Sequence, residues 1–298
     1  MGNYYSDKVA VVTGAASGLG LGFAGRLLAE GVRALWMADF NSELLEREAR
    51  GLNRQYPGRV FPVVADCSKQ SDVESLIGQA GSRCGELDFL FNNAGRPMTR
   101  PSERIDIEDF EKLVQLNYMG VVYGTLAALK IMLRQGHGHI VNTASCGGLL
   151  PVPFQAAYGS TKAAVIEFTR CLALEYFDRD VHFSQISPTN VATNIFSAEQ
   201  EKEMRKQGKS ASEIKEALAK IRPPQGSMPL REAVDYVFEK LAAKEVDIVF
   251  GEDGRALYRL FCRDQRKFNE EFAYETARKR RAFYEAYYNG DRDAVFPG

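Results

Sequence analysis

The 298-residue chain lacks the segments and the charge imbalance typical of membrane, secreted or nucleic-acid-binding proteins. No apolar run approaches the ~20 residues that span a bilayer, and the N-terminus has no basic-then-apolar signal peptide. With 38 Lys and Arg against 39 Asp and Glu, a net charge of -1 gives no overall field that attracts nucleic acid or an anionic membrane. We therefore expect a cytoplasmic globular protein with no nucleic-acid partner and no transmembrane segment.

Cysteine and histidine are both scarce, which bears on redox state and on metal binding. The three histidines include His137 and His139, which adjoin an expected strand, but no Cys or acidic cluster completes a metal site there. We predict no metal. The cysteines have no C-x-x-C spacing and are typical of free thiols in a reducing compartment. They are Cys67, Cys84, Cys146, Cys171 and Cys262.

Short apolar runs alternate with helical stretches along most of the chain, which predicts repeated strand–helix units and a parallel sheet. Strands are expected at residues 8–13, 34–38, 60–65, 87–91, 139–142, 181–186 and 246–250. Helices are expected at residues 18–30, 42–55, 71–84, 107–133 and 155–177. With right-handed crossovers, these elements form a single-domain, Rossmann-like, doubly wound sheet of about seven strands with helices on both faces.

A glycine-rich turn, T-G-A-A-S-G-L-G at residues 13–20, separates the first strand from the first helix. Glycines let backbone N–H groups approach a pyrophosphate, which the helix N-terminus also attracts. Asp39 ends the second strand, about 20 residues after Gly20, where a carboxylate accepts adenosine ribose hydroxyls and repels a 2′-phosphate. This context predicts a dinucleotide site.

Tyr158 and Lys162 stand four residues apart in Y-G-S-T-K, thirteen residues after Ser145. Four residues are about one helical turn, so both side chains face the same way. A free tyrosine titrates near ~10, and a neighbouring ammonium favours the phenolate. Taken alone, the pair is more often an ordinary piece of helix surface. Together with the glycine-rich turn, it points to a general base beside a serine that binds the substrate oxygen.

These motifs, with N-N-A-G at residues 92–95 and Asn117 in the long helix, resemble the short-chain dehydrogenase/reductase family, in its compact NAD-dependent branch. The resemblance covers roughly residues 8–193. It implies that Tyr158 is the general acid/base, that Lys162 lowers the pKa of Tyr158 and binds the nicotinamide ribose, and that Ser145 binds the substrate oxygen. Asn117 would hold a water that links Lys162 to solvent.

The resemblance also implies a cofactor-binding set, and the cofactor is read as NAD. NADP-using relatives usually carry a basic residue before the middle glycine or after strand two, where this chain has Ser17 and Phe40. One departure is Thr189, which stands where relatives usually have glycine, so the backbone there must avoid positive φ. The implied contacts are Gly14, Ser17, Gly18, Leu19, Gly20, Asp39, Phe40, Asp66, Cys67, Asn93, Ala94, Gly95, Tyr158, Lys162, Pro188, Val191 and Thr193.

On the substrate side, Leu149 and Gln155 join Ser145 and Tyr158 as expected contacts, and residues 194–228 are expected to form a lid or a packed amphipathic helix. The apolar loop before Tyr158 suggests a bulky hydrophobic secondary alcohol or ketone, such as a hydroxysteroid. The alternatives are an NADPH-dependent ketoacyl-type reductase and a non-catalytic NAD(H)-binding regulatory protein. The first would call for a basic residue near Ser17 or Phe40 that this chain lacks.

Residues 1–254 are expected to form the catalytic domain, and residues 255–298 a helical extension. Aromatic residues in that tail recur at helical spacing among basic ones. Such a stripe could contact RNA or a membrane surface, but an intramolecular or subunit contact is favoured. The family usually assembles through its long helices, so a homodimer or homotetramer is expected.

Overall fold

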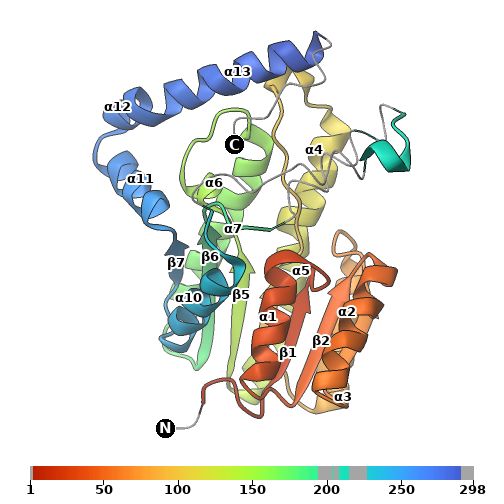
Figure 1. The fold of residues 1–298 in the computed structure, drawn as a ribbon. Coiled ribbons are helices and arrows are strands. Elements are labelled where there is room, and N and C mark those ends of the chain that lie inside the picture. Colours follow the sequence, from red (N-terminus) through yellow and green to blue (C-terminus); the bar gives the residue numbers. More distant parts are fainter. Residues whose placement is uncertain (1–2, 194–203, 205–207, 215–226, 290–298) are drawn as a thin grey trace.

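The computed structural model describes residues 3–193, 204, 208–214 and 227–289. Seven parallel strands form one sheet in the order β3-β2-β1-β4-β5-β6-β7, with helices on both faces (Figure 1). This confirms the predicted fold. The strands are β1 Val9–Thr13, β2 Ala34–Asp39, β3 Val60–Val64, β4 Phe89–Asn92, β5 Gly138–Thr143, β6 Val181–Pro188 and β7 Asp247–Phe250.

The helices before the tail are α1 Gly18–Ala29, α2 Ser42–Gln55, α3 Gln70–Cys84, α4 Ile107–Val114, α5 Gly120–Gln135, α6 Cys146–Leu149, α7 Ala156–Glu175 and α10 Leu230–Ala242. β1 is buried along its whole length because helices cover both of its faces. The chain passes from β1 to β2 on one side and later places β4 on the other. The carboxyl ends of β1 and β4 therefore border the crevice where such sheets bind ligands.

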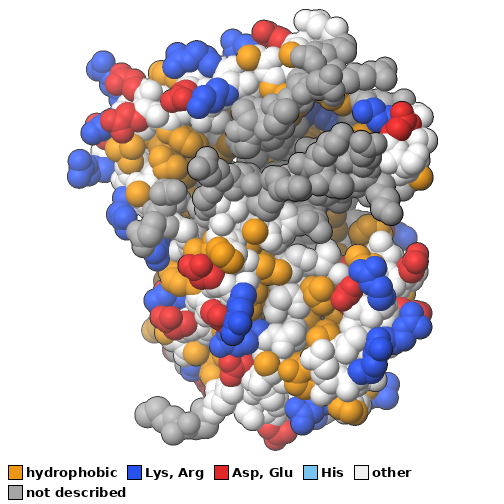
Figure 2. Space-filling model, viewed as in Figure 1, with side chains coloured by type: hydrophobic (Ala, Val, Ile, Leu, Met, Phe, Trp, Pro, Cys, Tyr) orange, Lys and Arg blue, Asp and Glu red, His pale blue; other side chains and the backbone are white. Residues whose placement is uncertain are grey.

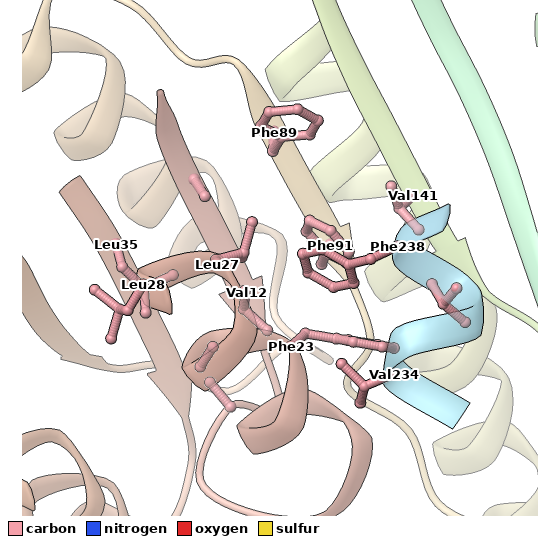
Figure 3. Packing of buried hydrophobic residues seen from close by; sticks show 14 of the residues in the cluster. Val12, Phe23, Leu27, Leu28, Leu35, Phe89, Phe91, Val141, Val234 and Phe238 are labelled. Carbon is pink, nitrogen blue, oxygen red and sulfur yellow. The ribbon is translucent and has the colours of Figure 1, made fainter. Parts of the chain in front are cut away.

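One face of the sheet is covered by α1, α2 and α10, and its largely aliphatic core contains a group of packed aromatic rings. Phe23 of α1 packs on Phe91 of β4 with ring centroids 5.3 Å apart, and Phe238 of α10 stacks on Phe91 at 6.0 Å (Figure 3). No helix was predicted at residues 230–242. α10 is nevertheless a full part of this core, since it buries five apolar side chains.

The opposite face is covered by α3, α5 and α7. The predicted long helix is continuous over Ile107–Gln135, but a π-helical turn at Gln115–Met119 joins α4 to α5. By length and composition alone, this helix is long enough and apolar enough to cross a membrane, with a mean hydropathy of 1.3. The sequence analysis expected no such segment. Ala128, Leu129 and Met132 of this helix pack in the core between the sheet and α3, as in a core helix.

The tail continues from β7 as α11 Glu252–Arg263, α12 Gln265–Phe268, a π turn at Asn269–Ala273 and α13 Tyr274–Tyr288. Phe268 is fully buried in a cluster with Leu149 of α6 and Val165 of α7. Figure 1 shows α13 lying across the top of the molecule, above α4 and α6. The aromatic stripe thus makes intramolecular contacts.

An acidic cluster does adjoin His137, which corrects the sequence analysis on that point. Ligand atoms of Glu86, Asp88 and His137 lie within 4.8 Å of one another. Two basic side chains of the protein already pair with these acids: Lys8 Nζ lies 2.8 Å from Asp88, and Arg33 pairs with Glu86 at 2.7 Å. Long-range chain folding, not local sequence, brings these groups together.

Candidate active site

The glycine-rich turn packs closely enough to require its glycines. A side-chain carbon at Gly20 would lie 2.1 Å from the carbonyl oxygen of Gly14, and one at Gly14 would lie 2.9 Å from the Cα of Ala94. Ser17 is exposed at the N-cap of α1, and its hydroxyl makes no capping bond. The first N–H groups of α1 and this hydroxyl therefore suit an anion such as a pyrophosphate.

The N-N-A-G segment is bound to the glycine-rich turn through Thr13. The Thr13 hydroxyl accepts from the N–H groups of Asn93 and Ala94, at 2.9 and 3.0 Å. The Asn93 amide in turn donates to the Thr13 carbonyl at 3.1 Å. At the other end of the turn, Thr193 carbons lie 3.7 Å from the position that a Cβ of Gly18 would occupy. These contacts fix one cradle from three loops.

Asp39 is buried at the end of β2, where its carboxylate also shapes the turn. It accepts from the N–H of Ala16 at 3.1 Å and from that of Asn41 at 3.0 Å. Phe40 beside it is 79% exposed. Asp66, after β3, accepts from Ser68, and its neighbour Cys67 is buried. A carboxylate and an exposed ring at this edge suit an adenosine, the first for its ribose and the second for its base.

Ser145, Tyr158 and Lys162 meet where β5 leads into α6 and α7. The Ser145 hydroxyl and the Tyr158 ring both lie within 3.6 Å of the point that a Cβ of Gly147 would occupy, and the hydroxyl also caps α6 by accepting from the N–H of Gly147 at 3.1 Å. Lys162 is buried, and its Nζ donates to the Thr143 carbonyl at 2.7 Å. The Nζ lies 6.0 Å from the centre of the Tyr158 ring. The predicted triplet is therefore assembled on one side of α7.

The pKa of Tyr158 differs from the sequence expectation. Burial raises this pKa, and the nearby Ser145 hydroxyl lowers it only in part. Burial also lowers the pKa of Lys162, to about 8. The ammonium is desolvated and rests against a carbonyl, so it does not offset the burial of the phenol. Lys162 alone therefore does not lower this pKa.

This burial gives Lys162 a measurable effect on stability. The pKa of Lys162 falls from 10.5 to about 8 on folding. Between these two pH values, the unfolded chain binds more protons than the folded protein, so stability rises with pH. The lysine therefore destabilises the fold most below pH 8. We expect Lys162→Met to gain about 1–3 kcal/mol of unfolding free energy relative to the unmodified protein at pH 7. The gain should disappear by about pH 10. Urea unfolding across this range checks it, and a pH-independent difference would contradict it.

Asn117 sits in the π turn between α4 and α5. Its side-chain oxygen accepts from the N–H of Arg96 at 2.9 Å, and its amide donates to the Arg96 carbonyl at 2.9 Å. A Cβ at Gly95 would lie 3.2 Å from this oxygen and 3.4 Å from Lys162 Nζ. Asn117 thus binds the loop after β4 next to the lysine. The water-mediated relay stays a prediction.

The two expected substrate contacts have different surroundings. Gln155 Oε1, Ser145 Oγ and the Tyr158 ring all lie within 3.6 Å of the point that a Cβ of Gly147 would occupy. Leu149 is buried in the cluster beneath the tail. Gln155 therefore lies beside Ser145 and Tyr158, whereas Leu149 packs on the tail. Contact of either side chain with substrate stays a prediction.

Thr189 occupies the position of the family's usual glycine without a positive φ, as the sequence analysis requires. Its hydroxyl donates to the Phe250 carbonyl at 3.1 Å. A Cβ at Gly251 would lie 2.2 Å from this hydroxyl, and one at Gly254 would lie 2.0 Å from Thr189 Cγ2. The space for the threonine is thus provided by two glycines at the start of α11.

We expect Gly254→Ala to destabilise the protein by about 1–3 kcal/mol, because the methyl group overlaps the Thr189 side chain. Thr189→Gly in the same chain removes that overlap and should recover most of the loss. Thermal unfolding of the two single variants and the double variant measures this coupling. Additive effects would contradict the packing described here.

Several residues that build the site were not among the site residues predicted from the sequence. Thr13 and Thr143 bind site residues through a hydroxyl and a carbonyl, and Gly147 leaves space beside Ser145. Thr13 begins the glycine-rich turn and Gly147 lies two residues after Ser145, and these positions were the available signal. The sequence carries no signal for the contact of the Thr143 carbonyl, because every residue has a backbone carbonyl.

The chain matches the family model described as short chain dehydrogenase over residues 8–204. Among curated proteins, it is 37% identical over 191 residues to a levodione reductase of Leifsonia aquatica, covering 63% of this chain and 71% of that protein. It is 34% identical over 192 residues to 3beta-hydroxysteroid dehydrogenase 2 of Eggerthella lenta, covering 64% and 73%.

Solved structures agree on the fold and differ in their cofactors. A short chain dehydrogenase/reductase from Burkholderia phymatum in complex with NAD matches with a TM-score of 0.76 and 29% identity, covering 88% of this chain and 95% of that one. An alcohol dehydrogenase from Thermococcus sibiricus complexed with 5-hydroxy-NADP matches with a TM-score of 0.68 and 26% identity, covering 82% and 95%.

Proposed function

The chain belongs to the short-chain dehydrogenase family, an oxidoreductase family that acts on alcohols and ketones, and we propose that it transfers a hydride between NAD(H) and a bulky, hydrophobic secondary alcohol or ketone. The observation that carries the proposal is the meeting of Ser145, Tyr158 and Lys162 beside Gly147. It lies at the same edge of the sheet as the glycine-rich turn.

In this proposal, the alcohol oxygen binds between the hydroxyls of Ser145 and Tyr158. Tyr158 takes the hydroxyl proton during oxidation and returns it during reduction, while Ser145 stabilises the charge that develops on the oxygen. Lys162 binds ribose hydroxyls of the cofactor and supplies charge near the phenol. When bound, the nicotinamide accepts the hydride and, in its oxidised form, brings a positive charge into the site.

NAD is preferred over NADP in this proposal because of the charge at the end of β2. The carboxylate of Asp39 is buried and held in place by two backbone N–H groups, so a 2′-phosphate placed there would meet an uncompensated negative charge. Ser17 and Phe40 supply no cation to offset it. The relatives do not decide the point, since both cofactor types occur among them.

The substrate class is supported by the side chains around Ser145 and Tyr158 and by a relative. Among the described residues, the polar side chain of Gln155 lies next to Ser145 and Tyr158, and the Tyr158 ring itself packs on an apolar cluster around Met98 and Leu113. One curated relative is a hydroxysteroid dehydrogenase. A fused-ring secondary alcohol with one further polar group fits these features.

We also propose that the protein forms a homodimer or homotetramer in the cytoplasm. Leu126 and Leu133 on α5 and Leu174 on α7 are large apolar side chains exposed on the two long helices. A second copy of the chain could cover these exposed leucines, and their exposure therefore supports a homodimer or homotetramer. On the visible face in Figure 2, acidic and basic side chains are interspersed over the described residues, which supports a protein without a nucleic-acid partner. We place the protein in the cytoplasm as part of the same proposal.

The test is NADH formation by the purified protein on a panel that ranges from small secondary alcohols to hydroxysteroids, with NAD and NADP compared. We expect turnover with NAD on the larger members. A site that oxidises only small polar alcohols would overturn the substrate class. Tight NADH binding without turnover of any alcohol would favour the regulatory alternative.

A further inference from the structure

Helix α13 reaches two loops that border the proposed substrate site. The hydroxyl of Tyr284, which is 9% exposed, donates to the Thr99 carbonyl in the loop after β4. The Tyr284 ring packs on Phe154 in the loop before α7, with centroids 5.4 Å apart. One turn earlier, Arg280 Nη1 donates to the Pro153 carbonyl at 2.8 Å. The tail thus contacts both loops through two buried side chains.

The two loops are also bound to each other at the residues that α13 contacts. The N–H of Arg100 donates to the Phe154 carbonyl at 2.8 Å. The Gln155 amide donates to the Thr99 hydroxyl at 3.3 Å. Thr99 therefore accepts from the tail with its carbonyl and from Gln155 with its side chain. A shift of α13 would move Thr99 and, with it, the support of Gln155.

The loop before α7 needs such support because its backbone is strained. Phe154 has a φ of +67°, a left-handed conformation that is uncommon for a bulky residue and persists only where surrounding contacts impose it. Contacts on Pro153 and on the Phe154 ring come from α13, and the contact on its carbonyl comes from Arg100. Gln155 follows at once and begins the turn that leads to Tyr158.

We propose that Tyr284 is a positioning residue for the alcohol substrate: it holds Thr99 and Phe154 so that the Gln155 side chain stays beside Ser145 and Tyr158. This inference rests on the proposed function and adds the C-terminal extension to the substrate site. The tail lies beyond the part of the chain that the family model matches, residues 8–204. Alcohol selectivity then depends on a helix more than a hundred residues away from the reacting groups in sequence.

The test compares Tyr284→Phe, which removes the bond to Thr99 and keeps the ring, with Tyr284→Ala, which removes both. We expect the KM for the alcohol to rise about fivefold in the first and tenfold or more in the second. The KM for NAD should stay unchanged. Tyr274→Phe is the matched control, because Tyr274 begins the same helix and is 54% exposed. A merely structural role would lower the melting temperature and the active fraction, with both KM values unchanged.

A second readout needs no substrate. Hydrogen exchange of peptides covering residues 96–105 and 147–157 should accelerate in both Tyr284 variants and not in Tyr274→Phe, because the Arg100 N–H bond loses its support. Unchanged exchange, or an unchanged alcohol KM in Tyr284→Ala, would overturn the positioning role. If the unmodified protein oxidises no alcohol, the proposed function fails, and the exchange result still decides whether Tyr284 holds the loops.

Discussion

Replacing Tyr158 with Phe is expected to lower kcat by about 10²- to 10⁴-fold, the range typical of a lost general acid/base. The change removes one hydroxyl and keeps the ring, which packs on Met98 and Leu113. Without that hydroxyl, the alcohol proton has no acceptor beside Ser145, since Lys162 donates to the Thr143 carbonyl. The fold and the cofactor cradle, which depend on the loops after β1 and β4, should remain intact.

Steady-state kinetics with NAD and the best alcohol measure this loss, and NADH fluorescence measures cofactor binding separately. Tyr176→Phe serves as the control, because Tyr176 caps the opposite end of α7 and its ring packs on Phe183. Both cofactor binding and turnover should survive in the control. A Tyr158→Phe enzyme that keeps more than about a tenth of its kcat would remove Tyr158 from the chemistry.

The second large effect is expected at the adenosine end of the cofactor cradle. Replacing Asp39 with Ser and Phe40 with Arg removes a buried carboxylate and adds a cation at a side chain that is 79% exposed. A 2′-phosphate would then meet a positive charge in place of a negative one. We expect the ratio of kcat/KM for NAD to that for NADP to fall about 100-fold or more, roughly 2.7 kcal/mol.

Kinetics with both cofactors at matched concentrations measure this ratio. Phe40→Ser is the control, because it keeps the carboxylate of Asp39 and should leave the preference for NAD nearly unchanged. Asp39 also accepts from the N–H groups of Ala16 and Asn41, so the serine is expected to weaken the turn somewhat. A double variant that still prefers NAD as strongly as the unmodified protein would show that Asp39 does not select the cofactor.

The sheet, and the one-turn spacing of Tyr158 and Lys162, were predictable from the sequence because their signals are local. Buried strands of four to eight residues alternate with helices, and Tyr158 and Lys162 are one turn apart on α7. The same kind of signal was present and missed at α10, where Ala233, Val237 and Leu241 recur every four residues. The sheet, the Tyr158–Lys162 pair and α10 all depend on residues close together in the sequence, so their patterns are visible within short sequence windows.

What the sequence could not predict depends on chain segments that are far apart. Tyr284 and Thr99 are separated by 185 positions, and nothing near either residue marks the other as its partner. The side chain of Thr189 fits only because Gly251 and Gly254 leave room for it. The π turn at Asn117 and the raised pKa of Tyr158 likewise come from packing. The lid expected at residues 194–228 lies mostly outside the described residues.

The most direct test of the central claim follows the hydrogen atom itself. An alcohol from the panel that carries deuterium on its carbinol carbon is incubated with NAD and the protein, and the reduced nicotinamide is analysed by mass spectrometry. The account predicts one deuterium in the reduced nicotinamide with the unmodified protein and almost none with Tyr158→Phe. Ketone formed with no label in the nicotinamide would contradict direct hydride transfer at this site.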